Sequence, residues 1–547
     1  MASQPPFRIG LCLAGAVSAG AYTAGVIDYL IEALQEWQKR KDQQTPNTPL
    51  HNVQIPIIGG ASAGGMTGII LASAINQTYT PLSSFSSPLE EPQPSHKLYH
   101  SWVDLVQDDM FPLLLKTDDI KSKQIYSLLN SSFLDEIAKR VTEPLQENKV
   151  DFPFIDPNLR LFVTLTNLQG FEYNVAFKSG TANNQYMMSI HNDYACFALN
   201  KNNYSNDGWT PLDFFSGLNV PLARNAAMAT GAFPIGLKAR GVERELQHVK
   251  DNVWLKQILA NSPLASASGK IETVNVDGGV INNEPFDKVQ DVVRSITSDT
   301  EASTYDSFKG TVLMVDPFPS EEEKFDNGQG LMTIAGNTLS AMLAQARAKP
   351  PQLEEAWSSN NPSQFLISPS RPDPHNSDKR LDGSLAIACG ALGGFSGFMH
   401  KHFRVHDFFL GRANCERFLR HYFTIPANSK NPIFAEGYQS VVDKTKFTSK
   451  KDGGLQIIPI FTEEKPAIPL PIFPNGSNWP TISERQVNSW RGLLKSRVQS
   501  ILLNFDDYRW DTKALLWIGA QVVLNRKAAD AALEAIRKSL YEHHLIK

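Results

Sequence analysis

The feature that most constrains this chain is an apolar run that ends in a glycine-rich turn and continues into a second, helix-like run, and it occurs twice. Residues 7–14 are suited to a strand buried on both faces, and residues 20–37 then carry apolar side chains at helical spacing. Residues 53–58 and 63–75 repeat the arrangement. This alternation predicts an α/β fold with a mainly parallel sheet that is covered by helices on both faces.

The remainder of the chain adds further strands, polar connections and a helical tail. Three segments rich in Pro, Ser or charged residues are expected to be surface insertions, at 81–97, 297–308 and 360–380. After about residue 425 the alternation gives way to a Pro-rich region and then to a helix. Further strands are predicted at 159–165, 271–276, 311–315 and 365–368.

The composition narrows the choice of partners and compartment. The formal net charge is −4 at pH 7 and the Lys and Arg residues are scattered, so no nucleic-acid surface is predicted. The four cysteines lie far apart, with neither a C-x-x-C pair nor the spacing of zinc ligands. This usage favours reduced thiols in the cytoplasm.

Two uncharged stretches imitate membrane or targeting segments. Residues 9–27 and 57–75 approach the length of a membrane span, and small residues after the first apolar run also imitate a signal peptide. Both stretches are diluted by Gly, Ser and Ala. We therefore expect each to be a buried strand–turn–helix unit.

A serine lies in the second glycine-rich turn. Gly60, Ser62 and Gly64 fit the pattern G-x-S-x-G, in which a strained turn between a strand and a helix lifts a nucleophilic serine above the sheet. The glycines leave room for backbone that passes close to the serine. The local pattern is equally compatible with a glycine-rich turn whose serine caps a helix.

An activated serine needs a base, and Asp277 is the first candidate. It ends an apolar run and is followed by Gly278 and Gly279, so its carboxylate is expected at a sheet edge where the chain turns sharply. An ordinary Asp-Gly turn is the commoner meaning of this pair of residues.

The first turn offers backbone N–H groups for a negative charge. Residues 13–30 follow the first predicted strand and open the first helix, a junction that suits an oxyanion hole. The loop has Val17 where a dinucleotide-binding G-x-G-x-x-G would have its second glycine, which argues against a nucleotide site.

Taken together, "LAGAVSAGAY", "GASAG" and "DGGVINNEP" resemble, in this order, the patatin-like phospholipases. That family has a glycine-rich oxyanion loop, a G-x-S-x-G elbow and a later D-G-G or D-G-A. The resemblance covers about residues 7–290, including "ARNAAMATGAFPIGL", and is looser over 397–419. It implies a three-layer α/β/α hydrolase domain over 1–424, followed by a partly helical extension over 425–547 that resembles nothing we recognise.

The resemblance also implies a function. Ser62 becomes the nucleophile and Asp277 the base of a dyad without histidine, and the substrate becomes an acyl ester of a lipid. Neither a metal nor an organic cofactor is implied, and peripheral contact with a membrane stays open. The oxyanion hole is expected at Gly15, Ala16 and Val17, and the turn glycines are Gly60, Gly64, Gly278 and Gly279.

A carboxylate with a pKa near ~4 is a weak base for a hydroxyl, so this dyad requires desolvation of Asp277 and a strong oxyanion hole. The family loop usually reads G-G-G-x-R-G, whereas this chain has Ala16, Val17 and Ala19 at the second, third and fifth positions. These departures support an alternative, a catalytically weak or silent lipid-binding or regulatory protein on the same scaffold.

The sequence leaves further alternatives open. His406 followed by Asp407 permits a Ser-His-Asp esterase, and His402 and His406 have the i, i+4 spacing of metal ligands on a helix. Residues 385–398 suit either a mobile apolar lid or a buried glycine-rich segment. In the tail, one apolar stripe flanked by basic residues suits either the protein's own core or an anionic membrane, and consists of Ala529, Leu533, Ile536 and Leu540.

Overall fold

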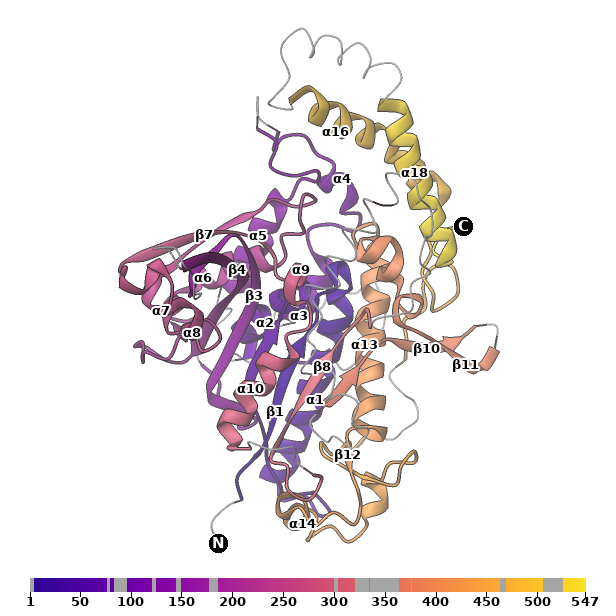
Figure 1. Cartoon of the computed structure of the whole chain (residues 1–547). Coiled ribbons are helices and arrows are strands. Elements are labelled where there is room, and N and C mark those ends of the chain that lie inside the picture. The colour runs from indigo at the N-terminus through magenta and orange to yellow at the C-terminus, as the bar shows by residue number, and fades with distance from the viewer. Residues whose placement is uncertain are drawn as a thin grey trace.

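The computed structural model describes most of the chain. The described residues are 4–75, 79–82, 96–120, 124–143, 149–176, 185–299, 304–319, 334, 364–374, 376–462, 469–504 and 525–547. Within them, strands and helices alternate along the first 315 residues, and helices dominate after residue 400 (Figure 1). Of the predicted insertions, most of 81–97 and parts of 297–308 and 360–380 lie outside the described residues.

One mixed sheet organises the described residues. Its strands follow the order β5-β4-β3-β2-β1-β8-β9, β7 also pairs with β3, and β6 pairs with β7. The pairs β1–β2, β2–β3, β1–β8, β8–β9 and β4–β5 are parallel, and the pairs β3–β4, β3–β7 and β6–β7 are antiparallel. The strands are β1 (Phe7–Leu13), β2 (Val53–Gly60), β3 (Ile155–Ala176), β4 (Gln185–Leu199), β5 (Thr210–Leu212), β6 (Arg240–Glu245), β7 (Lys270–Asp277), β8 (Gly310–Val315) and β9 (Gln364–Ile367).

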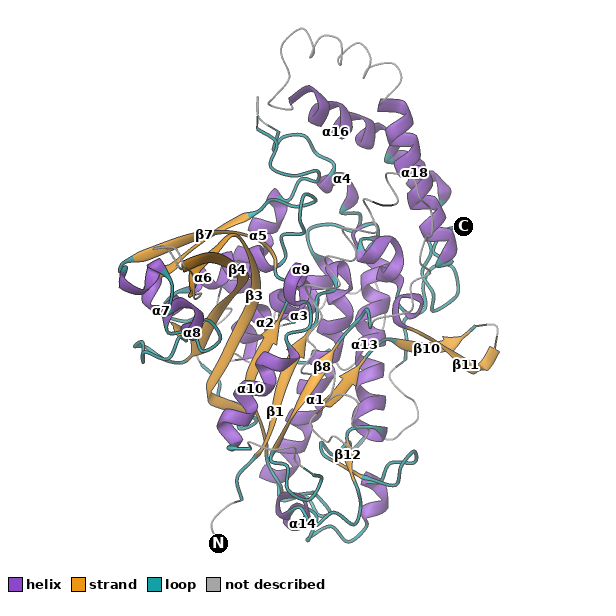
Figure 2. Cartoon of the chain, in the orientation of Figure 1, coloured by secondary structure: helices purple, strands orange, loops and turns teal. Residues whose placement is uncertain are grey.

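Helices cover both faces of this sheet (Figure 2). The first part of the chain contains α1 (Gly20–Asp42), α2 (Ser62–Ile75), α3 (Lys97–Tyr99), α4 (Phe111–Leu114), α5 (Ser132–Thr142), α6 (Val220–Thr230), α7 (Leu246–Lys250), α8 (Lys256–Leu259), α9 (Gly279–Asn282) and α10 (Phe286–Thr297). The second part contains α13 (Lys401–His421), α14 (Pro432–Gly437), α15 (Glu484–Ser489), α16 (Arg491–Asn504) and α18 (Asn525–Glu542).

Short elements complete the description. The hairpin of β10 (Ser370–Asp373) and β11 (Asn376–Asp382) projects from the body, and β12 (Thr424–Ile425) pairs with β13 (Leu455–Gln456) (Figure 1). A π-helical turn, η2, spans His100–Asp104. The 3₁₀ turns are η1 (Val17–Ala19), η3 (Pro263–Ser266), η4 (Gly383–Ala386), η5 (Ala388–Gly394), η6 (Ser396–Phe398) and η7 (Lys444–Phe447).

Alternate residues of the central strands enter two separate cores, as the pleat of a strand requires. Ile58 of β2 belongs to the larger core, which it shares with α1, α2 and α13. Its neighbour Ile57 belongs to the smaller core, with Val289 and Val293 of α10. A strand buried on both faces is apolar at almost every position, and this explains why β1 and β2 were visible as continuous apolar runs.

The predicted α/β fold is confirmed. The strands predicted near residues 159, 271, 311 and 365 are β3, β7, β8 and β9. The uncharged stretches 9–27 and 57–75 form strand–turn–helix units, as predicted. In the part of the chain that is described, no helix combines the length and the hydropathy that crossing a bilayer requires.

The apolar stripe of the tail packs on the protein's own core, as one of the two predictions held. Ala529, Leu533, Ile536 and Leu540 of α18 are all buried and belong to the larger core cluster. The helix is also tied to the middle of the chain, because the N–H of Leu392 donates to Ser539 Oγ at 2.9 Å.

Candidate active site

The register of the sheet brings Ser62 and Asp277 to the same edge. Leu13 at the end of β1 pairs with Gly60 at the end of β2, and Gly60 pairs with Val163 of β3. Two residues further along β3, Leu165 pairs with Asp277 at the end of β7. Strand β3 therefore lies between the ends of β2 and β7, and this places Ser62 next to Asp277 although they are 215 residues apart in the sequence.

Ser62 occupies a strained turn between β2 and α2. Its φ is +50°, a backbone conformation that residues with side chains rarely adopt. A Cβ on Gly64 would lie 2.1 Å from the carbonyl oxygen of Leu13, and a Cβ on Gly60 would lie 2.7 Å from the backbone of Gly64. Both positions therefore require glycine. The N–H of Ser62 donates to Thr230 Oγ1 at 2.8 Å, which holds the turn on α6.

The hydroxyl of Ser62 contacts the carboxylate of Asp277. Ser62 Oγ donates to Asp277 Oδ2 at 2.6 Å, and the N–H of Gly279 donates to Oδ1 at 2.7 Å. Both side chains are buried. A Cβ on Gly278 would lie 2.1 Å from the carbonyl oxygen of Thr164, so the turn after β7 also requires glycine. These two hydrogen bonds hold the carboxylate in one orientation, with Oδ2 facing the hydroxyl of Ser62.

The loop after β1 lies directly against Ser62. A Cβ on Gly15 would lie 3.0 Å from Ser62 Cβ. The N–H of Gly15 donates to the carbonyl oxygen of Asn283 at 3.3 Å, whereas the N–H groups of Ala16 and Val17 donate no hydrogen bond within the described residues. Val17 has a φ of +47°, an outlier for a β-branched residue, and it stands where the family loop has its third glycine.

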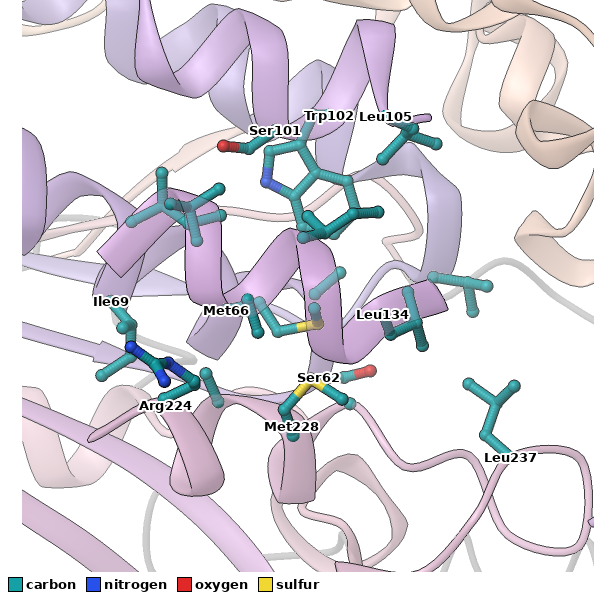
Figure 3. Close-up of a pocket in the computed structure, with 18 of the residues that line it drawn as sticks. Ser62, Met66, Ile69, Ser101, Trp102, Leu105, Leu134, Arg224, Met228 and Leu237 are labelled. Atoms are coloured by element: carbon teal, nitrogen blue, oxygen red, sulfur yellow. The ribbon is translucent and has the colours of Figure 1, made fainter. Parts of the chain in front are cut away.

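A largely apolar pocket opens beside the two side chains (Figure 3). It encloses about 860 Å³, including the part open to solvent. Helices α2 and α6 form two of its walls, because each presents one stripe of residues at helical spacing. The lining includes Val17, Ser62, Met66, Ile69, Ser101, Trp102, Arg224, Met228, Phe233, Leu237 and Asp277.

The lining contains one cation among the described residues. Arg224 lies beside Ile69 in Figure 3, and its Nε donates to Thr142 Oγ1 at 3.0 Å. A second cation, Lys97, lies behind this part of the wall and donates to the carbonyl oxygens of Val141 and Glu143. Burial lowers the pKa of Lys97 to about 8. At neutral pH Arg224 and Lys97 therefore carry positive charge on this side of the pocket, Asp277 contributes a carboxylate to the lining, and most of the wall is apolar.

Residues 385–398 form buried turns that support the loop after β1. Ser18 Oγ donates to the carbonyl oxygen of Gly394 and accepts the N–H of Gly397, the latter at 3.1 Å. The rings of Phe395 and Phe233 meet edge to face, with their centroids 5.7 Å apart. Of the two predictions for this segment, the packing favours the buried glycine-rich one.

His406 lies in a different part of the molecule. Its Nδ1 is 2.7 Å from Asp407 Oδ1, and its ring packs against Trp479, which is not a lining residue of the Ser62 pocket. The N–H groups of Ala388 and Cys389 donate to Asp407, so this carboxylate holds the turn η5 on α13. The described residues contain no cluster of three or more His, Cys, Asp or Glu side chains arranged to hold a metal.

Several residues of the site had no signal of their own in the sequence. Thr230, which accepts the N–H of Ser62, lies in the stretch "ARNAAMATGAFPIGL" but was not singled out there. Asn283 follows the D-G-G motif and orients the loop after β1 through its carbonyl group. Trp102 reaches the pocket from η2, a segment with no recognisable pattern.

Comparisons with known proteins identify the family of this chain. A family model described as patatin-like phospholipase matches residues 11–289. "Uncharacterized protein y4iI" of Sinorhizobium fredii is 31% identical, over 92% of this chain and 76% of its own length. The crystal structure of VipD from Legionella pneumophila was also matched at 12% identity, over 98% of this chain and 92% of its own, but the TM-score of 0.21 is too low to compare sites. The chain belongs to the patatin-like phospholipase family, a family of lipid acyl hydrolases.

Proposed function

We propose that this protein hydrolyses carboxylic esters of lipids, as a phospholipase A or lipase does, with Ser62 as nucleophile and Asp277 as base. One observation carries the proposal: the hydrogen bond of 2.6 Å between Ser62 Oγ and Asp277 Oδ2 in the lining of an apolar pocket. A nucleophile and a base within hydrogen-bond distance are the minimum that acyl transfer requires.

In the first half of the reaction, Ser62 Oγ attacks the ester carbonyl carbon while Asp277 Oδ2 takes the hydroxyl proton. The carbonyl oxygen becomes an oxyanion, and collapse of this intermediate breaks the ester bond. The leaving alcohol takes the proton from Asp277, and the acyl group remains on Ser62. In the second half, water repeats the attack with Asp277 as base, and the fatty acid leaves.

The oxyanion needs N–H donors, and the structure offers them on two elements. The N–H groups of Ala16 and Val17 are free within the described residues, and the loop that carries them lies against Ser62. Helix α2 begins at Ser62, and although the N–H groups of Ser62 and Gly65 are already paired, the dipole of the helix and the N–H groups between them favour a negative charge at the same point. Removal of one such donor slows catalysis by roughly 100-fold in other hydrolases.

The pocket supports an acyl chain as the bound group. Met66, Ile69 and Met228 line it, and thioether side chains adapt to irregular apolar ligands. Along α2, Ile69 lies seven residues beyond Ser62, or roughly 10 Å at the rise of an α-helix. The pocket therefore accommodates the chain of a fatty acyl ester rather than only a small acyl group.

Covalent labelling tests the proposal. A lipid-like fluorophosphonate is expected to modify Ser62 in the wild type, as mapped by mass spectrometry, and to modify no residue in Ser62→Ala. In Asp277→Asn the rate of labelling is expected to fall by about 100-fold or more, because the base is lost while the side chain keeps its shape.

Ser101→Ala is the matched control for this experiment. Ser101 is a second buried serine that lines the same pocket, and its hydroxyl donates to the carbonyl oxygen of Lys97. We expect its removal to leave the labelling of Ser62 unchanged. Labelling that persists at full rate in Asp277→Asn would remove Asp277 from the mechanism.

A second candidate is a silent or weakly active lipid-binding protein. The observation that favours it is Val17, whose side chain lines the pocket and whose φ is +47° in a loop that is glycine-rich in the family. A folded wild type that binds a fluorescent fatty acid but resists the fluorophosphonate would support this function and contradict the hydrolase.

We also propose the cytoplasm as the site of action. None of the four cysteines forms a disulfide and all four are buried, which is the arrangement of thiols in a reducing compartment. Burial raises the pKa of Cys389 well above its usual value, so this thiol stays protonated and unreactive.

A further inference from the structure

Large apolar side chains are exposed together beside the Ser62 pocket. We call them the mouth patch, and the exposed fractions of its members are 51% for Tyr126, 47% for Leu128, 44% for Phe233 and 76% for Ile235. Single exposed apolar residues are common on soluble proteins, but a cluster of this kind usually marks a binding surface.

Two segments that are far apart in the sequence are joined in this patch. The N–H of Leu128 donates to the carbonyl oxygen of Ile235 at 2.8 Å, and the N–H of Leu129 donates to that of Gly236 at 3.0 Å. Both hydrogen bonds join a bend at residues 128–129 to the turn at residues 234–236. The apolar side chains on the two segments are therefore held side by side by backbone contacts.

The backbone conformation of Ile235 is strained, and its side chain gains little burial within the described residues. Its φ is +66°, a region where β-branched residues are genuine outliers and which Gly or Asn adopts with little strain. Its side chain is also the most exposed of the patch. Because burial within the chain does not offset this strain, the position of Ile235 indicates that its side chain is buried against another molecule.

The patch is continuous with the pocket. Phe233 and Leu237 flank Ile235 in the sequence, and both line the Ser62 pocket. Leu237 is drawn beyond Ser62 in Figure 3, on the opposite side of the pocket from Arg224. A lipid that touches Ile235 is therefore next to the wall of the pocket, on the side of the reacting serine.

The patch also carries a cation. Lys238 Nζ lies 4.6 Å from the centre of the Tyr126 ring, and Lys238 pairs with no carboxylate among the described residues. A cation beside exposed aromatic and aliphatic side chains matches the interface of a bilayer, where anionic headgroups lie above the acyl chains.

We propose that the mouth patch docks this protein on the surface of an anionic lipid bilayer, with Ile235 and Leu128 inserted among the acyl chains. The proposal rests on the lipid hydrolase function proposed above and identifies the face through which the substrate enters. A bilayer fits better than a second copy of the chain, because Lys238 lies in the patch without an acidic partner.

Vesicle binding tests the proposal directly. In the background Ser62→Ala, which leaves the vesicles intact, we expect binding to vesicles of phosphatidylcholine and phosphatidylglycerol by sedimentation. Ile235→Asn is expected to weaken this binding about tenfold, as loss of one buried isoleucine predicts. Asn also suits the positive φ, so the variant is expected to fold, and Leu128→Ser provides a second, independent variant.

Val442→Asn is the matched control. Val442 is 91% exposed, and its N–H donates to Asn47 Oδ1 at 2.9 Å, so it belongs to neither segment of the patch and its loss removes an exposed apolar side chain elsewhere. Equal binding by Ile235→Asn and wild type would overturn the proposal, as would equal loss in Val442→Asn. A wild-type dimer in sedimentation velocity that Ile235→Asn dissociates would assign the patch to a second copy instead.

A water-soluble ester separates this proposal from the proposed function. With active protein and p-nitrophenyl butyrate, we expect Ile235→Asn to keep the wild-type rate, whereas its release of fatty acid from vesicles falls with its binding. If the wild type hydrolyses neither substrate while Ile235→Asn still loses binding, the docking surface stands and the hydrolase function fails. If Ile235→Asn loses both activities equally while its binding is unchanged, the patch serves the pocket and not docking.

Discussion

At the scale of single residues, the site depends on glycines that no other residue can replace. Gly64→Ala would put a Cβ 2.1 Å from the carbonyl oxygen of Leu13 and 2.5 Å from that of Ala14, and backbone atoms of two elements cannot move apart cheaply. We expect this variant to lose about 1–3 kcal/mol of unfolding free energy. Its labelling by the fluorophosphonate is expected to be lost with it.

Gly68→Ala is the control on the same helix. Its added Cβ would meet only side-chain atoms of Ile58 and Leu161, at 3.2 and 3.3 Å, and alanine is the better helix former. Urea unfolding monitored by circular dichroism should therefore separate the two variants. Equal midpoints for Gly64→Ala and Gly68→Ala would contradict the steric account of the elbow.

A buried histidine makes the stability depend on pH. His51 packs against Trp37 and Tyr438 and is hydrogen-bonded to the carbonyl group of Ile457 at 2.8 Å. Burial, assisted by the nearby Lys41, lowers its pKa from 6.5 to about 4. As pH falls, the unfolded chain therefore binds this proton first. The stability that the neutral ring contributes is complete above pH 6.5 and is lost as pH falls toward 4.

Protonation of His51 lowers the free energy of unfolding by roughly 3 kcal/mol at most. His51→Phe keeps an aromatic ring but does not titrate, so its urea midpoint is expected to change less than that of the wild type between pH 7 and pH 5. Burial also lowers the pKa of His400 and of His402. The variant is therefore expected to keep part of the dependence of stability on pH. Parallel pH profiles for the two proteins would show that His51 is protonated without cost.

At the scale of elements, α1 and α13 pack by direct contact of their backbones. A Cβ on Gly25 of α1 would lie 1.9 Å from the carbonyl oxygen of Phe408, and a Cβ on Gly411 of α13 would lie 2.2 Å from that of Tyr22. The close approach also allows Arg412 of α13 to form buried ion pairs with Asp28 and Glu32 of α1.

Gly25→Ala is therefore expected to separate the two helices and to strain these ion pairs. We expect an unfolding free energy lower by about 3 kcal/mol, the upper part of the range for overpacked cores. Gly492→Ala on α16 is the control, since its added Cβ would meet nothing within 4 Å. An unchanged thermal midpoint in Gly25→Ala would mean that α13 can shift without loss.

At the scale of the whole molecule, the residues after 425 share a core with the residues before it. Phe434 packs against Phe7 of β1, with ring centroids 5.1 Å apart. Trp490 packs against Phe111 and donates to Asp109 Oδ2 at 2.9 Å. Arg497 of α16 donates to the carbonyl oxygens of Lys116, Ser127 and Leu128.

A chain that ends at residue 424 is accordingly expected to be insoluble, because it would expose the partners of these side chains to water. The full chain is expected to melt in one transition in calorimetry. A soluble, cooperatively folded fragment of residues 4–424 would contradict this and would support a hydrolase domain that folds without its extension, which is compatible with the sequence-based division at 424.

The parts of the fold that were predictable depend on local patterns. Strands buried on both faces leave continuous apolar runs, which is why β1 and β2 and the helices after them were found from their residues. The family was recognisable because its motifs are constrained by backbone geometry, as the clashes at Gly60, Gly64 and Gly278 illustrate. The walls of the pocket could not be predicted, because Trp102 and Arg224 come from separate segments and only packing brings them together.

The sequence by itself determined the alternation of strands and helices and the glycines at the two turns, because these follow from the period of the side chains and from steric limits within a few residues. Only the tertiary structure decided that Ser62 Oγ meets Asp277 Oδ2, that the C-terminal helices complete the core, and that Ile235 stands exposed beside the pocket. These contacts depend on the register of β3 between β2 and β7 and on packing between distant segments. Neither leaves a trace in the local pattern of residues.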